Sequence, residues 1–185
     1  MKRSLGPQTL PMPAPVWVIG SYDTAGRANG MTASWAGICN STPPCVYAAI
    51  RRSRYTYDNI VARQAFTVCV PSAAYVKEAD YLGIASGRDE DKFARAGLTA
   101  VAGEKVDAPY IAQFPVAMEC RVRQTVDLGS HTVFIGEVLD VKVEEEGLGE
   151  HGRPDAEKLD LFVWMDGYRA LGRHLGQAFH IGREV

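Results

Sequence analysis

The sequence predicts a mainly β protein, an antiparallel barrel or sandwich with a few helices attached. Two observations carry this prediction: strand-like segments outnumber helix-like segments along the 185 residues, and most links between successive strands are short. Short links join antiparallel neighbours, whereas a doubly wound parallel sheet needs a crossover of a dozen or more residues. Because the chain has no internal repeat or long linker, residues 1–185 are expected to form one domain.

The first half of the chain carries four predicted strands. After an extended, proline-rich lead-in at 7–15, runs rich in Val, Ile and aromatic residues predict strands at 16–22, 30–39, 45–51 and 66–70. Turn residues at 23–27 separate the first two, and Gly26 is free there to adopt a positive φ.

Two segments have helical spacing. Residues 55–63 predict a helix with Ser53 as its cap and with Ile60 and Val61 on its apolar side. Residues 72–95 predict a second helix, because apolar residues recur there at near-helical intervals.

The second half of the chain is again strand-like. Two long strands are expected at 115–127 and 131–144, and a short one at 161–165. Residues 147–152 match G-x-G-x-x-G, but three glutamates precede them and the next strand begins too soon for a βαβ unit of about 30 residues. This segment is therefore expected to be an acidic loop rather than a dinucleotide site.

Composition excludes several classes of protein. The net charge of −2 gives no overall basic field that would attract a nucleic acid. No apolar run approaches the length of a membrane span, which is about 18 residues. Prolines interrupt the basic N-terminus, so no secretion signal is expected and the predicted compartment is the cytoplasm. The four cysteines are expected to be free thiols, and the four scattered histidines predict no metal site.

Residues 29–35 form the first candidate site segment. A turn leads into a strand on which Thr32 and Ser34 point one way and Ala33 and Trp35 the other. Small residues let a flat ligand approach the backbone, although an ordinary hairpin with one polar face has the same pattern.

The run Arg51-Arg-Ser-Arg-Tyr-Thr56 follows a predicted strand and precedes a predicted helix. Free N–H groups at a helix start, two hydroxyls and three arginines suit a phosphate. A solvated edge with a capped helix is the alternative. Lys92, after a glycine-containing turn, adds a further positive charge, and His131, next to a Gly-Ser turn, is expected at a barrel rim.

The order of four motifs resembles that of the flavin-reductase-like, FMN-binding split-barrel family. The motifs are the polar strand, the S-x-x-T turn, Asp91-Lys92-Phe93 and the G-x-H-x-x-x-x-G-x-V segment at 129–138. Within that family the resemblance is to the flavoredoxin subgroup, and it spans about residues 10–170. It implies a homodimer of FMN-binding split barrels.

The resemblance also implies site residues. The flavin ring would be lined by Asn29, Met31, Thr32, Ser34 and Trp35, and its phosphate held by Arg51, Ser53, Thr56 and Lys92. His131 would be the catalytic residue, near the flavin and an incoming nicotinamide, and Trp164 an aromatic neighbour of the flavin from either subunit. Ser130 stands where family enzymes often carry an acid.

The implied function is that of an FMN-binding oxidoreductase or electron-transfer flavoprotein. An NAD(P)H-dependent flavin reductase, a non-catalytic FMN-binding protein and the neighbouring pyridoxamine-phosphate-oxidase-like class are the alternatives. The expected partners are NAD(P)H or a protein redox partner, with no nucleic acid and no membrane.

Overall fold

A computed structural model describes residues 1–10 and 13–184, and it confirms the predicted mainly β fold. Residues 11 and 12 of the proline-rich lead-in, and residue 185 of the expected single domain, lie outside the described residues. The main sheet is antiparallel and has seven strands in the order β3-β2-β6-β9-β10-β5-β4. Its strands are β2 (Trp17–Tyr22), β3 (Ala28–Ala33), β4 (Ala36–Ser41), β5 (Pro44–Ile50), β6 (Ala65–Val70), β9 (Val116–Asp127) and β10 (Thr132–Val143).

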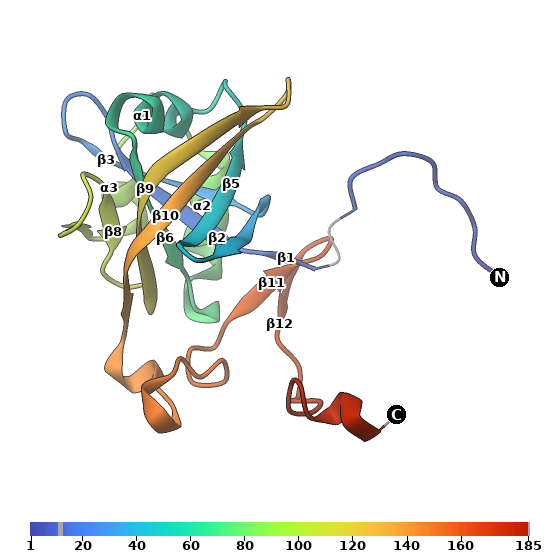
Figure 1. Cartoon of the computed structure of the whole chain (residues 1–185). Helices are drawn as coiled ribbons and strands as arrows, with labels where there is room; N and C mark the ends of the chain where they lie inside the picture. The colour runs from blue at the N-terminus through green and yellow to red at the C-terminus, as the bar shows by residue number, and fades with distance from the viewer. Residues whose placement is uncertain (11–12, 185) are drawn as a thin grey trace.

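The connection between β3 and β4 explains why this sheet curls into a barrel. These strands are the two edges of the sheet, yet Ser34 and Trp35 alone separate them in the chain. The Trp35 carbonyl also accepts a 2.8 Å hydrogen bond from the Ala49 amide. This bond extends the β4–β5 ladder by one position. The short link keeps the two edges close to each other, and β2, β6, β9, β10 and β5 curve between them (Figure 1).

The barrel interior is a close-packed apolar core. Ile19, Phe66 and Phe134 are almost fully buried in it and belong to one contact cluster. Gly136 allows this packing, because a Cβ there would lie 2.5 Å from the Phe66 ring.

The helices lie outside the barrel. They are α1 (Tyr55–Arg63), α2 (Val76–Ile84) and α3 (Lys92–Ala96), with a single 3-10 turn, η1 (Ala73–Tyr75), before α2. Leu82 of α2 and Phe93 of α3 pack against Val18 in a second apolar cluster. This cluster fixes α2 and α3 against β2 and β3.

Smaller elements complete the chain. A hairpin pairs β7 (Ala100–Ala102) with β8 (Pro109–Ile111), and a three-stranded sheet has the order β1-β11-β12. Its strands are β1 (Ala14–Pro15), β11 (Phe162–Trp164) and β12 (Tyr168–Ala170), and 3-10 turns occur at η2 (Glu145–Gly147), η3 (Glu150–Gly152) and η4 (Ile181–Glu184). Figure 1 shows that this sheet lies beside the barrel and that both chain ends extend away from it. The acidic segment 147–152 is a loop, as predicted.

Two predicted elements are wrong in their extent. The single strand 30–39 is divided at Ser34 and Trp35, because the chain passes there from one sheet edge to the other. The single helix 72–95 is interrupted after Ile84, and α3 begins afresh with Asp91 as its N-cap, whose Oδ1 accepts a 3.0 Å bond from the Ala94 amide.

The bounds predicted for α1 are confirmed, but two details are wrong. Arg54, not Ser53, occupies the N-cap position, and its side chain makes no capping bond. Ile60 is fully buried, whereas Val61 is exposed, because only one stripe of this short helix faces the barrel.

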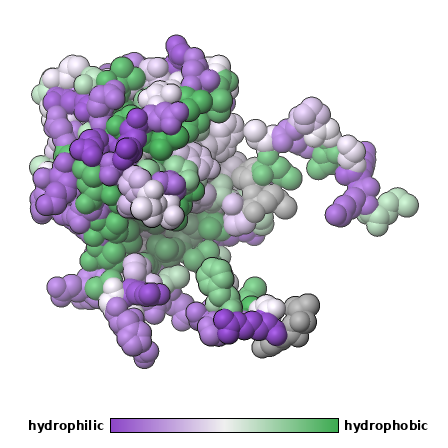
Figure 2. Space-filling view, in the orientation of Figure 1, coloured by the Kyte–Doolittle hydropathy of each residue, from purple (hydrophilic) through white to green (hydrophobic). Residues whose placement is uncertain are grey.

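The strand predicted at 131–144 has an unexpected orientation. Phe134 and Gly136 point into the core, while the alternating apolar residues Val133, Ile135 and Leu139 are half-buried on the outer face. Figure 2 shows apolar residues among charged ones on the face over which β9 and β10 run. One chain by itself therefore leaves an apolar sheet face incompletely covered.

Candidate functional site

Two adjoining cavities lie where β3, β5 and β10 meet the start of α1. We call the larger one, of about 340 Å³, the aromatic cavity; its walls are Met31, Thr32, Ala33, Ser34, Trp35, Ala49, Ile50, Arg51, Arg54, His131 and Trp164. We call the smaller one, of about 170 Å³, the helix cavity; its walls are Asn29, Met31, Ser53, Arg54, Tyr55, Thr56, Ala85, Ser86, Gly87 and Lys92. Met31 and Arg54 belong to both, so the two cavities share a wall.

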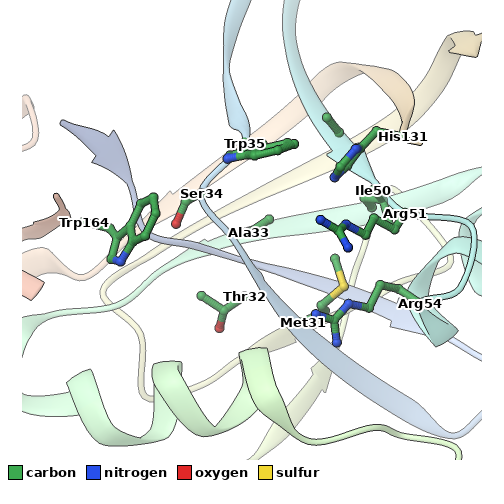
Figure 3. Close-up of a pocket in the computed structure, with 11 residues that line it drawn as sticks. Met31, Thr32, Ala33, Ser34, Trp35, Ile50, Arg51, Arg54, His131 and Trp164 are labelled. Atoms are coloured by element: carbon green, nitrogen blue, oxygen red, sulfur yellow. The ribbon is translucent and has the colours of Figure 1, made fainter. Parts of the chain in front are cut away.

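The aromatic cavity has two rings in contact at its rim, tilted relative to each other. The Trp35 and His131 ring centroids lie 4.4 Å apart, at an angle of 38° (Figure 3). Oγ of Ser130 lies 3.0 Å from Nδ1 of His131 and fixes that side of the ring. Burial, and next the nearby Arg51 guanidinium, lower the pKa of His131, so the imidazole is neutral at pH 7.

The three clustered arginines divide into two kinds. Arg52 forms an ion pair of 2.5 Å with Asp127. Arg51 and Arg54 make no ion pair with any described residue, and Figure 3 shows both side chains directed into the aromatic cavity. Two positive charges are therefore available to a ligand.

The helix cavity combines a helix start with a buried amide. The first N–H groups of the nine-residue α1 have no partner within the helix. Nδ2 of Asn29 donates a 2.9 Å bond to Oγ1 of Thr56, and Oδ1 of Asn29 is buried without a partner among the described residues. Gly87 permits this close packing, since a Cβ there would lie 2.3 Å from that oxygen.

Lys92 supplies a buried cation to the helix cavity. Its Nζ donates hydrogen bonds to the carbonyls of Leu82, at 2.9 Å, and Ala85, at 3.2 Å. An ammonium group has three donors, so one remains for a ligand. Burial, and next the charge of Arg54, lower the pKa of Lys92 to about 8.

The structure brings the sequence-predicted residues together, but not in one compartment. The aromatic cavity receives Met31, Thr32, Ser34, Trp35, Arg51, His131 and Trp164, and the helix cavity receives Asn29, Met31, Ser53, Thr56 and Lys92. Arg51 does not line the helix cavity, where Arg54 lies instead. The Thr32 hydroxyl donates to the Ala79 carbonyl of α2 and is therefore engaged within the protein.

Sequence reasoning missed the loop Ala85-Ser86-Gly87 and the separate role of Arg54. The Ser-Gly pair is a turn signal that marks the break between α2 and α3. Arg54 was indicated only as a member of the arginine run, because the sequence does not tell which arginine meets a distant carboxylate such as Asp127.

The residues present fit one elongated, phosphorylated and planar ligand. The helix start, hydroxyls and cations suit a phosphate in the helix cavity. The indoles suit a flat ring in the aromatic cavity. A β-barrel with adjoining sites of these two kinds has a shape and chemistry that suit a mononucleotide with a large aromatic ring.

Comparison with known proteins identifies the family. The flavin reductase like domain family matches residues 9–172, so the chain belongs to this family. The structure is similar to the flavoredoxin of Desulfovibrio vulgaris (Miyazaki F), with 48% identity, coverage of 98% of this chain and 100% of that one, and a TM-score of 0.94. The predicted family resemblance, to flavoredoxins in particular, is thus confirmed.

Curated relatives are similar to this chain over part of their length. An FMN reductase (NADH) of Bradyrhizobium diazoefficiens is 32% identical over 68% of this chain and 67% of that protein. A relative from Archaeoglobus fulgidus is 37% identical over 62% of this chain, and the aligned part spans 65% of that protein. Within the described residues, no helix is both long and apolar enough to cross a membrane.

Proposed function

We propose that the chain is an FMN-binding oxidoreductase that resembles flavoredoxin. The observation that carries the proposal is the shared wall of the two cavities, which puts a phosphate compartment next to a planar one. The FMN phosphate would lie in the helix cavity, near Thr56, Arg54 and Lys92. The ring would lie in the aromatic cavity, near Trp35 and Trp164.

Bound FMN would supply hydride or single-electron chemistry, while the chain fixes its position and surroundings. His131 is a neutral ring at the rim of the aromatic cavity, with Ser130 on Nδ1 and Nε2 without a partner among the described residues. It is therefore placed to hydrogen-bond an incoming ligand and to hold or give a proton at Nε2.

An NAD(P)H-dependent flavin reductase is a second candidate. The similarity to an FMN reductase (NADH) favours it. Ser130, which contacts His131 where family enzymes often carry an acid, does not supply the negative charge of that acid. A non-catalytic FMN-binding protein and a protein electron carrier use the same contacts, so the electron donor distinguishes the three.

We further propose that the chain is a homodimer. On the outer sheet face, Val133 lies between Ala49 and Val126, and Ile135 lies beside Tyr47. A contiguous apolar face of this kind is costly to leave in water, and a second copy would cover it with the same face.

Cofactor analysis tests the proposed function. Mass spectrometry of the heat-released cofactor is expected to find one FMN per chain, and anaerobic titration with NADH and NADPH reports whether either bleaches the flavin. FAD, or no flavin after refolding in excess FMN, would contradict the proposal. Bleaching by NADH or NADPH selects the reductase, and bleaching only by a reduced protein carrier selects the electron-transfer role.

A further inference from the structure

Cys39 and Cys45 lie on the adjacent strands β4 and β5, outside both cavities. In the β4–β5 ladder, Ile38 pairs with Val46 and the next pair is Asn40 with Cys45. Cys39 is therefore an extra residue next to the position opposite Cys45, as in a β-bulge. Directly opposed residues of antiparallel strands have Cα atoms about 4.5 to 5.5 Å apart. A disulfide spans Cα separations of about 4.4 to 6.8 Å, so the backbone of this hairpin permits one.

Side-chain contacts bring the two thiols to the same part of the hairpin. The Pro43 carbonyl accepts a 2.8 Å hydrogen bond from Nδ2 of Asn40 and a 3.4 Å one from Sγ of Cys45. The bulge interrupts the alternation that would send the Cys39 side chain to the face opposite Asn40. Burial, and next the charge of Cys45, raise the pKa of the Cys39 thiol, so the two sulfur atoms are neighbours.

The two remaining cysteines lie too far away to take part. Cys120 is on β9, two strands from β5, and this places it about 9 to 10 Å from β5. Cys69 is on β6, one strand further, and Phe66 rather than Cys69 opposes Cys120. A disulfide does not form between Cα atoms more than about 7 Å apart. Of the four cysteines, all within the described part of the chain, Cys39 and Cys45 are therefore the pair that a disulfide can join.

The two thiols differ in their access to solvent. Cys39 is exposed on β4, an edge strand, whereas Cys45 is only 4% exposed. A reagent in solution therefore reaches Cys39 first, and Cys45 is placed to attack the sulfur of Cys39 afterwards. Ile50, which lines the aromatic cavity, is about 16 Å from Cys45 along β5. The pair is thus separate from the proposed flavin site.

We propose that Cys39 and Cys45 form a redox-modification site that reacts with low-molecular-weight disulfides. The Cys39 thiolate attacks one sulfur of a disulfide R–S–S–R, which forms a mixed disulfide and releases one thiolate R–S⁻. The Cys45 thiolate then attacks the Cys39 sulfur, which forms the intramolecular disulfide and releases the second R–S⁻. The two cysteines together lose two electrons and two protons, and the reagent is reduced to two thiols R–SH. This site goes beyond the proposed function and does not depend on the flavin.

The experiment treats the full chain with glutathione disulfide and follows the products by mass spectrometry of the intact chain and of its peptides. We expect the chain to lose the mass of two hydrogen atoms and the peptides to place the link between Cys39 and Cys45. Cys39→Ser should slow the reaction at least about tenfold, because it removes the accessible thiolate. Cys45→Ser should instead accumulate a glutathione adduct on Cys39. Cys69→Ala is the matched control, since it removes a thiol outside the pair, and should react as the wild type does.

Several results would overturn the proposal. They are the absence of any reaction, a disulfide that links two chains, a stable glutathione adduct on Cys39 of the wild type, and a wild-type rate in Cys39→Ser. The linked chains would assign Cys39 to a contact between copies, and the stable adduct would show that Cys45 does not reach it. Flavin content is measured separately. A chain that binds no flavin contradicts the proposed function, whereas the Cys39–Cys45 disulfide formed in that chain still supports this site.

Discussion

The Tyr55 hydroxyl donates a 2.7 Å hydrogen bond to Oδ2 of Asp23, and so ties the first residue of α1 to the turn between β2 and β3. Arg63, the last residue of α1, donates a 2.6 Å bond to the Asp23 carbonyl. One buried residue therefore holds both ends of the helix. Although burial alone would raise it, hydrogen bonds from Tyr55, Arg27 and the turn lower the pKa of Asp23 to about 2.

Removing this contact should loosen the start of α1. We expect Asp23→Asn to lower the free energy of unfolding by about 1 to 3 kcal/mol, because it disturbs a buried, charge-assisted hydrogen-bond network. Asp58→Asn is the control, since the exposed Asp58–Arg88 pair contributes at most about 1 kcal/mol. Urea denaturation measures both variants, and equal losses would contradict a special role for Asp23.

The buried cation of the helix cavity should discriminate between flavins by their phosphate. We expect Lys92→Met to weaken FMN binding by about 1.5 to 3 kcal/mol, the range for hydrogen bonds to charged groups. Riboflavin, which lacks the phosphate, should bind as it does to the wild type. Quenching of flavin fluorescence measures both affinities, and equal losses for the two ligands would show that Lys92 acts on the fold.

The pKa of Lys92 also predicts how FMN affinity depends on pH. A bound phosphate favours the charged ammonium, and Lys92 loses its proton above pH 8 in the flavin-free protein. FMN affinity should therefore be nearly constant up to about pH 7, decline as the pH passes through about 8, and fall by up to about tenfold per pH unit above that. Riboflavin affinity should stay flat, and so should FMN affinity in Lys92→Met; a slope retained in this variant would assign the titration elsewhere.

We expect Trp164 to contribute both to binding of the flavin ring and to formation of the dimer. It lies on β11, pairs with Ala14 of β1 and lines the aromatic cavity of its own chain. Light scattering should find a dimer of about twice 20.2 kDa, and Trp164→Ala should weaken both the dimer and FMN binding. If the variant were a monomer with full FMN affinity, Trp164 would have no part in the site.

Local patterns predicted the class of fold, and the order of several short motifs indicated most of the residues that line the two cavities. The helix at 55–63 follows from the spacing of its apolar residues. The expected alternation of the polar strand is not seen, because Asn29, Gly30 and Met31 are all buried in succession on β3. The break at Ser34 and Trp35 was not predictable in this way, because both flanking segments favour strands. The chain bends there only because the two sheet edges have to meet.

The division of the site into two cavities was also beyond local reasoning. The sequence gives no reason to distinguish Arg51, Arg52 and Arg54 from one another. Only Arg52 has its charge offset, by an ion pair with Asp127, which lies 75 residues away in the chain. Lys92 similarly differs from a solvated lysine only because the end of α2 surrounds it with carbonyls. Such distinctions are set by tertiary contacts.

The link through Ser34 and Trp35 is both the seam of the barrel and a wall of the aromatic cavity. A flat ligand that contacts Trp35 therefore also stabilises the link between the two edge strands of the curled sheet. The Ala49 amide, which donates to the Trp35 carbonyl where the β4–β5 ladder reaches this link, is the natural probe. The hydrogen exchange of this amide should slow when flavin binds, because ligand binding raises the free energy of local opening of the barrel at this link.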